Sequence, residues 1–158
     1  MYLNLAESLS KDSMSVLAQR VINMVKDQES ITFQQTLGSI LLSKRSYDEA
    51  LKPFQWILSK QDTNLQCICN IGHCHFLTKR FKEAEEQYIK AIRVSSFTGQ
   101  DLDDPYVLQR LGSIYVSQKQ YGEASVIFEE CQAKYQNSFS LLNYGITLIY
   151  DETKRNFE

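Results

Sequence analysis

The stretch LGSIYVSQKQYGEASVIF, residues 111–128, decides the fold because its pattern occurs twice more upstream. It contains a Leu-Gly pair, a tyrosine three residues after the glycine, and then Tyr-x-x-Ala-x-x-x-Phe. The two earlier copies place the same kinds of residue in the same order. Their glycines, Gly38 and Gly72, lie one period apart, whereas Gly112 follows Gly72 after one period and a short insertion. Such self-similarity at a fixed period is the signature of a repeat protein.

Each copy predicts a hairpin of two helices. Leu37 and Leu41 follow helical spacing, as do Ala50 and Phe54, and the polar residues 44–46 between these pairs predict a short turn. The small residues, a glycine in the first helix and an alanine in the second, are expected where the two helices approach closely. Because one hairpin cannot bury its apolar face alone, neighbouring hairpins are expected to stack into an array.

The recurrence divides the chain into units of a single array. The expected units are a degenerate first repeat at 1–30, full repeats at 31–64, 65–98 and 105–138, an inserted loop at 99–104, and a truncated last repeat at 139–158. In the last unit we interpret residues 154–157 as a lengthened turn. The partial units at both ends are expected to belong to a longer array. An irregular helical bundle is the alternative architecture.

These motifs resemble the tetratricopeptide repeat family over about residues 31–138. The resemblance implies an all-α fold, a right-handed α-solenoid of antiparallel helix-turn-helix hairpins. It also implies a protein-binding scaffold with no catalytic activity and no cofactor. The sequence departs from the family pattern at Gln34 and Ile68, which stand where a tryptophan is usual.

The resemblance implies a concave groove lined by the first helix of each hairpin. Counted from repeat starts at Ile31, Leu65 and Pro105, and continued into the last unit, the groove carries Gln35, Ser39, Leu42, Cys69, Asn70, His73, Phe76, Gln109, Arg110, Ser113, Val116, Leu142 and Ile146. This set is nearly neutral, which favours a helix or an extended segment with apolar anchors as the ligand. The alternative is that its large apolar members only pack against neighbouring helices. The inserted loop is a second candidate for partner specificity.

A chaperone-tail clamp is incomplete in this sequence. Some family members bind the acidic C-terminal tails of heat-shock chaperones through a clamp of Lys, Asn, Asn, Lys and Arg. Asn70 and Arg110 occupy two of these positions, whereas Gln35, Ser39 and Tyr106 occupy the other three. Because a carboxylate is best bound by cations, the missing lysines disfavour chaperone-tail binding.

Cysteine and histidine cluster in residues 67–75, which invites a metal site. Cys69 and His73 are four residues apart and could share a helix face, but a structural zinc site needs four converging ligands. Cys67 and Cys74 are instead expected to be small buried residues. The sequence contains no phosphate-binding glycine motif and no glycine-rich turn that would supply an oxyanion site. We therefore expect no metal, no cofactor and no enzymatic activity.

The composition limits the functions and cellular compartments that the chain can have. The 17 basic and 19 acidic residues are interspersed, so a nucleic-acid surface is not expected. Apolar runs are too short to span a membrane, and the first residues lack a signal-peptide pattern. Three of the 4 cysteines fall in one expected helix, which favours a reducing intracellular compartment over a disulfide framework.

A closer similarity covers roughly residues 65–150. The long insertion is followed by VLQRLGSIY at 107–115 and later by NSFSLLNYGI at 137–146, in an order that is similar to an axonemal protein of cilia and flagella linked to outer dynein arms. This similarity implies axonemal partners in a large complex and a role in anchoring or regulating motility. The alternative is a general cytosolic adaptor or a chaperone cofactor.

Overall fold

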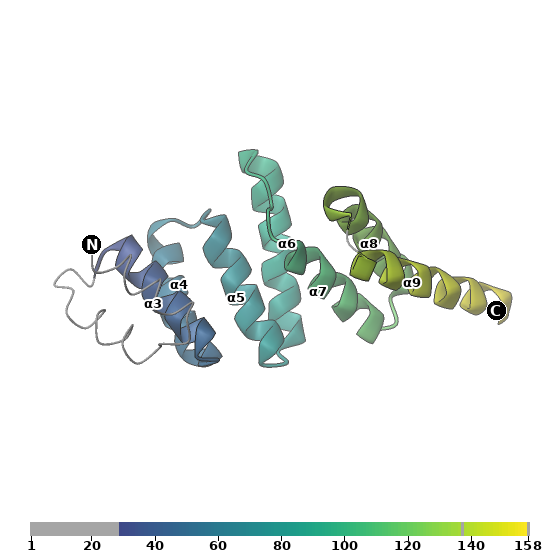
Figure 1. The fold of residues 1–158 in the computed structure, drawn as a ribbon, viewed down its shortest axis with the longest axis horizontal. Coiled ribbons are helices and arrows are strands. Elements are labelled where there is room, and N and C mark those ends of the chain that lie inside the picture. Colours follow the sequence, from purple (N-terminus) through teal and green to yellow (C-terminus); the bar gives the residue numbers. More distant parts are fainter. Residues whose placement is uncertain (1–28, 137, 158) are drawn as a thin grey trace. The chain divides into compact units, whose positions relative to one another are not determined.

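The computed structural model describes residues 29–136 and 138–157, so the predicted first repeat lies almost wholly outside the described residues. Every regular element in the described part is an α-helix, which confirms the all-α prediction (Figure 1). The helices are α3 (Ile31–Ser43), α4 (Tyr47–Lys60), α5 (Leu65–Leu77), α6 (Phe81–Thr98), α7 (Pro105–Ser117), α8 (Tyr121–Tyr135) and α9 (Ser138–Phe157).

The helices α3, α5 and α7 begin at capping side chains. Ser30, Asn64 and Asp104 each accept a hydrogen bond, at 3.0 to 3.2 Å, from a backbone N–H in the first turn of the helix that follows. Such a cap is worth about 1 kcal/mol. At α7 the cap is followed by Pro105, whose missing N–H costs nothing at a first helical position. These three helices start at Ile31, Leu65 and Pro105, the residues from which the groove positions were counted.

The turns inside the hairpins share one backbone conformation. Arg45, Lys79 and Lys119 have φ angles of 60°, 63° and 61°, in the left-handed region. In each turn the next N–H donates a backbone hydrogen bond to a carbonyl five residues earlier, as Ser46 does to Leu41 at 2.9 Å. This is the Schellman ending of a helix, which satisfies carbonyls that the helix leaves open. The three turns therefore reverse the chain in the same way.

The glycine of the first helix lies against the aromatic ring of the second. A Cβ atom on Gly38 would stand 2.6 Å from ring carbons of Phe54, and one on Gly112 would stand 2.7 Å from those of Phe128. Both rings are fully buried. The expected close approach of the two helices is confirmed, and the lack of a side chain on the glycine is what permits it.

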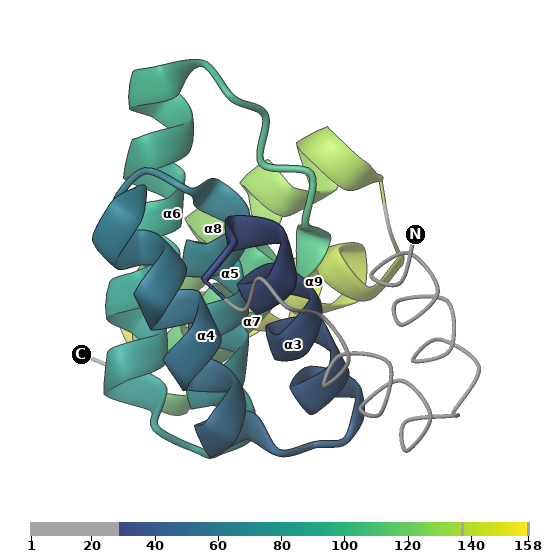
Figure 2. The same cartoon turned by 90° about the vertical axis from the view of Figure 1, so that its left-hand side faces the viewer.

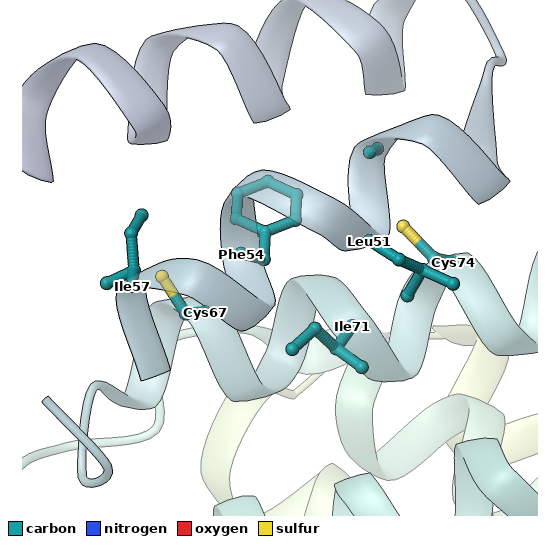
Figure 3. Close-up of a cluster of buried hydrophobic side chains, with 7 residues drawn as sticks. Leu51, Phe54, Ile57, Cys67, Ile71 and Cys74 are labelled. Atoms are coloured by element: carbon teal, nitrogen blue, oxygen red, sulfur yellow. The ribbon is translucent and has the colours of Figure 1, made fainter. Parts of the chain in front are cut away.

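The chain forms two compact units, Met1–Gln87 and Tyr88–Glu158. In the first unit α4 packs against both α3 and α5, and Figure 2 shows α3 and α4 side by side. The core between α4 and α5 is drawn in Figure 3 and consists of Ala50, Leu51, Phe54, Ile57, Cys67, Ile71 and Cys74. In the second unit α8 packs against α7 and α9.

The inserted segment is attached to α8. Leu102 is buried, and its carbonyl accepts a hydrogen bond from the hydroxyl of Tyr135. The carboxylate of Asp101 pairs with the ammonium of Lys134. The end of the inserted segment is therefore attached to α8 at two successive residues.

The last described helix is longer than expected. α9 has 20 residues and runs to Phe157, so the prediction of a turn at residues 154–157 is wrong. These residues contain no glycine or proline, and lysine and arginine are good helix formers, so nothing local stops the helix. None of the described helices has the length and apolar character that crossing a membrane requires.

Candidate peptide-binding surfaces

An open pocket lies between α3 and α5 in the first unit. It has a volume of about 430 Å³, within the range typical of ligand sites. We call it the α3–α5 pocket, and it is lined by Thr32, Gln35, Thr36, Ser39, Leu42, Gln66 and Asn70. Six of these side chains are polar, one is apolar, and none is charged.

Four predicted groove residues meet in this pocket: Gln35, Ser39, Leu42 and Asn70. The three other lining residues, Thr32, Thr36 and Gln66, were missed by the sequence prediction. The repeat period contained the signal, because Thr32 and Gln66 occupy the same position of successive repeats, as do Thr36 and Asn70. The missed residues lie one turn before predicted residues on the same helix face.

Hydrogen bonds inside the pocket leave several groups available to a ligand. The hydroxyl of Ser39 donates to the carbonyl of Gln35 at 3.0 Å, and that of Thr36 donates to Thr32 at 2.9 Å. Each hydroxyl oxygen can still accept a hydrogen bond. Gln66 donates to Asn70 Oδ1 at 3.3 Å, which orients the Asn70 amide. Among the described residues, Asn70 Nδ2 and the Gln35 side-chain amide make no hydrogen bond.

The other predicted residues of α5 are less open. Cys69 is 2% exposed, so the prediction that it lines an accessible groove is wrong. Its side chain is much shorter than that of Gln35, the equivalent residue of α3. His73 is half-buried. The ring of Phe76 meets Phe81 edge-on, with the centroids 5.6 Å apart, so this side chain packs within its own hairpin.

The sequence left two roles open for the apolar groove residues, contact with a ligand and packing against neighbouring helices. The position of Leu42 allows both. Leu42 packs against the core between α4 and α5 and also lines the α3–α5 pocket. Its partly buried side chain thus provides an apolar contact that the hairpin already holds in place.

In the cysteine and histidine cluster the three cysteines are buried, whereas His73 and His75 are half-buried. Burial raises the pKa of the Cys67 and Cys74 thiols to about 11, so both stay protonated near neutral pH. Burial and the nearby charge of Arg80 lower the pKa of His75. In the part of the chain that the structure describes, no three His, Cys, Asp or Glu side chains converge as a metal site requires. Neutral thiols are poor nucleophiles and poor metal ligands.

In the second unit the predicted residues divide between α7 and α9. Gln109, Ser113 and Val116 are half-buried on α7. Ser113 donates a hydrogen bond to the Gln109 carbonyl at 2.8 Å, as Ser39 does to Gln35 in the first unit. The predicted residues of α9, Leu142 and Ile146, are exposed.

Arg110 interacts with side chains at the start of its own helix. Its guanidinium lies 5.2 Å from the ring centroid of Tyr106. It also opposes the effect of burial on Asp104, since burial raises the pKa of that carboxyl and the arginine charge lowers it. Arg110, which occupies the arginine position of the chaperone-tail clamp, therefore already interacts with Tyr106 and Asp104.

The helical hairpins, two of which have a glycine under an aromatic ring, define a helical repeat fold. Residues 64–137 match the family model described as tetratricopeptide repeat. No curated protein matches the sequence of the chain.

Solved structures show the same fold over nearly the whole chain. PilF of Pseudomonas aeruginosa has a TM-score of 0.76 at 19% identity, covering 96% of this chain and 68% of its own. YrrB, described as a tetratricopeptide repeat protein with an unusual peptide-binding site, has a TM-score of 0.73 at 19% identity, covering 96% and 76%. The Cut9-Hcn1 hetero-tetramer of the APC/C has a TM-score of 0.74 at 18% identity; the match covers 93% of this chain and 29% of that one.

Proposed function

We propose that the chain is a non-enzymatic scaffold that binds an uncharged, extended peptide segment in the α3–α5 pocket. The observation that carries this proposal is the lining of the pocket, in which amide and hydroxyl groups surround one leucine and no charged side chain is present. The fold shared with repeat proteins, one of which is described by its peptide-binding site, supports the same function.

The chemistry of the pocket suits a peptide backbone. A primary amide both donates and accepts hydrogen bonds, as a peptide group does. Asn70 Nδ2 can donate to a ligand carbonyl, while its Oδ1 is held by Gln66. Leu42 offers an apolar contact beside these polar groups. An acidic ligand would find no cation in this lining, which disfavours a chaperone tail.

The equivalent positions of the second unit extend the proposal. Gln109, Ser113 and Val116 occupy the positions in the repeat at 105–138 that Gln35, Ser39 and Leu42 occupy in the repeat at 31–64. On this equivalence we propose them as peptide-binding residues of the second unit, and we keep the division of the chain into repeats as part of the proposal.

Peptide selection tests the pocket. Random peptides displayed on phage would be selected on the chain, and the enriched sequences synthesised with a fluorophore for anisotropy titration. We expect uncharged peptides whose affinity falls at least roughly tenfold on Ser39→Glu, because a bound peptide would enclose the carboxylate in a lining that offers it no cation. Ser125→Glu is the matched control, since Ser125 makes a similar local hydrogen bond, to the Gly122 carbonyl, but lies on α8 outside the proposed binding residues. Equal losses in both variants, or enrichment of acidic peptides, would contradict the proposal.

We further propose that the partners are axonemal subunits, such as those of outer dynein arms, and that the scaffold anchors or regulates motility complexes in cilia and flagella. The support is the resemblance to cilia- and flagella-associated protein 70 in the order of insertion and motifs over residues 65–150. The alternative is a general cytosolic adaptor.

Affinity purification from ciliated cells, followed by mass spectrometry, tests the axonemal proposal. Axonemal subunits should be recovered with the chain and lost with Ser39→Glu. Recovery of chaperones without any axonemal protein would contradict the axonemal proposal. Tight binding of a synthetic peptide ending in Glu-Glu-Val-Asp that is lost on Arg110→Ala would instead support chaperone-tail binding.

A further inference from the structure

The hydrogen-bonding groups that the α3–α5 pocket leaves open differ between its two helices. On α3, the hydroxyl groups of Thr36 and Ser39 donate their protons to backbone carbonyls one turn earlier, at 2.9 and 3.0 Å. Their oxygen atoms are therefore left as acceptors. On α5, Asn70 Oδ1 accepts a hydrogen bond from Gln66 at 3.3 Å, so the open end of this amide is its Nδ2 donor. The pocket thus offers two acceptors on α3 and an oriented donor on α5.

A peptide backbone alone cannot pair with all of these groups. One peptide group has a single N–H, whereas the hydroxyl oxygens of Thr36 and Ser39 both need a donor. The side-chain amide of Gln35 adds a further donor and acceptor to the same lining. Because a polar group that loses water without gaining a partner costs free energy, we expect a polar side chain of the ligand to enter the pocket as well. The volume of about 430 Å³ leaves room for one.

The primary amide is the side-chain group that fits this arrangement best. It carries a carbonyl that accepts and an NH2 group that donates twice. A carboxylate has no proton to donate and would face the two acceptor oxygens, and an ammonium group cannot accept from Asn70 Nδ2 and finds no anion in the lining. A hydroxyl group has one proton, which serves only one of the two oxygens. Leu42 offers an apolar contact to the methylene groups of such a side chain.

We propose that the α3–α5 pocket selects its peptide by taking up the side-chain amide of an asparagine or glutamine. The carbonyl of that amide accepts from Asn70 Nδ2, and its NH2 group donates to the hydroxyl oxygens of Ser39 and Thr36. Gln66 is a positioning residue, because its hydrogen bond to Asn70 Oδ1 sets which end of the Asn70 amide faces the ligand. This inference rests on the proposed peptide-binding function and names the kind of residue that the pocket recognises.

Four synthetic peptides test the selectivity. They are acetylated and amidated segments of alternating alanine and threonine, with glutamine, methionine, glutamate or lysine as the central residue. Each is titrated into the 15N-labelled full chain, and NMR follows the side-chain NH2 signals of Asn70. We expect the glutamine peptide to shift these signals and to bind at least roughly tenfold more tightly than the methionine and glutamate peptides. Methionine has a similar length but leaves the polar groups of the pocket without partners.

The variant Gln66→Glu tests the positioning role. A carboxylate only accepts hydrogen bonds, so it binds Asn70 Nδ2 and turns Oδ1 toward the pocket. We expect the glutamine peptide to lose at least roughly tenfold in affinity and the lysine peptide to gain. Gln55→Glu is the matched control, because it adds the same charge at an exposed position of α4 outside the pocket, and it should leave the preference unchanged. Circular dichroism checks that both variants remain folded.

The possible results separate this inference from the proposed function. Equal affinity of the glutamine and methionine peptides would overturn the inference and leave the proposed function standing, since both peptides are uncharged. Failure of the glutamine peptide to bind would also overturn it, and the phage selection would then decide the proposed function by itself. Tighter binding of the glutamate peptide would contradict both. A gain for the lysine peptide on Gln66→Glu, with no loss for the glutamine peptide, would show that charge alone acts and would refute the positioning role.

Discussion

Gly38 lies directly beneath the ring of Phe54, with three ring carbons between 2.6 and 3.0 Å from the place of a Cβ atom. Phe54 is a rigid ring in a fully buried environment, so it cannot turn aside as a flexible chain end would. The contact couples the two helices of the hairpin more tightly than their apolar spacing alone would indicate.

Gly38→Ala should therefore destabilise the protein. We expect a loss of about 1–3 kcal/mol in the free energy of unfolding, because the added methyl group overpacks the hairpin. Urea denaturation followed by circular dichroism measures it. Gly145→Ala is the matched control: its site is open, and alanine favours helix by about 1 kcal/mol, so this variant should gain stability. A loss of equal size in both variants would refute the packing explanation.

Lys119, the left-handed residue of its turn, should tolerate substitution by glycine but not by a β-branched residue. With φ at 61°, a β-branched residue is strained, and Lys119→Val should cost about 1–2 kcal/mol. Lys119→Gly removes the strain but loosens the unfolded chain, so its stability should stay within about 0.5 kcal/mol. Thermal denaturation of the two variants gives the comparison. Equal stability of the valine and glycine variants would show that the turn changes conformation at no cost.

The buried thiols should make stability depend on alkaline pH. The folded-state pKa of Cys67 and Cys74 is about 11, above the ordinary value of 9.0, so the folded protein holds these protons more tightly than the unfolded chain. Stability is then complete below pH 9 and falls as the pH rises toward 11. Urea titrations between pH 8 and 11 should show this decline, and Cys67→Ala with Cys74→Ala should flatten it. A decline of unchanged size in that double variant would assign the effect to other groups.

The hydrogen bond from Tyr135 should hold the inserted segment to α8. Tyr135→Phe removes the donor and leaves the Leu102 carbonyl without it, at a cost of about 1 kcal/mol. Hydrogen exchange of the amides at residues 99–104 should speed up in this variant. Asp101→Asn removes an exposed ion pair instead and should change exchange little. The opposite ranking of the two variants would mean that the ion pair is the main anchor.

The sequence predicted the hairpins because their cause is periodic. Helical spacing, a glycine paired with a later aromatic ring, and polar turns all recur with the repeat. The α3–α5 pocket was only partly predictable. Thr32, Thr36 and Gln66 were missed because only a few positions of each helix were counted, although repeat equivalence pointed to them.

The remaining errors come from properties that no spacing rule contains. Cys69 has the expected register, but it is only 2% exposed, and spacing alone does not predict the depth of a side chain. The helix through residues 154–157 continues because nothing in that stretch stops it. Whether the α3–α5 pocket and its equivalents bind a partner, and which one, stays a prediction, because an uncharged lining specifies a class of ligand rather than one protein.

The anchored insertion has a practical consequence for labelling. Leu102 and its partners on α8 hold the end of the insertion. The preceding residues, at the C-terminal end of α6, make few packing contacts. Phe97 is 88% exposed there, and Gly99 has open space around it. An epitope or a cysteine for a fluorophore placed between Thr98 and Gln100 would therefore report on the chain with little disturbance of the packing around it.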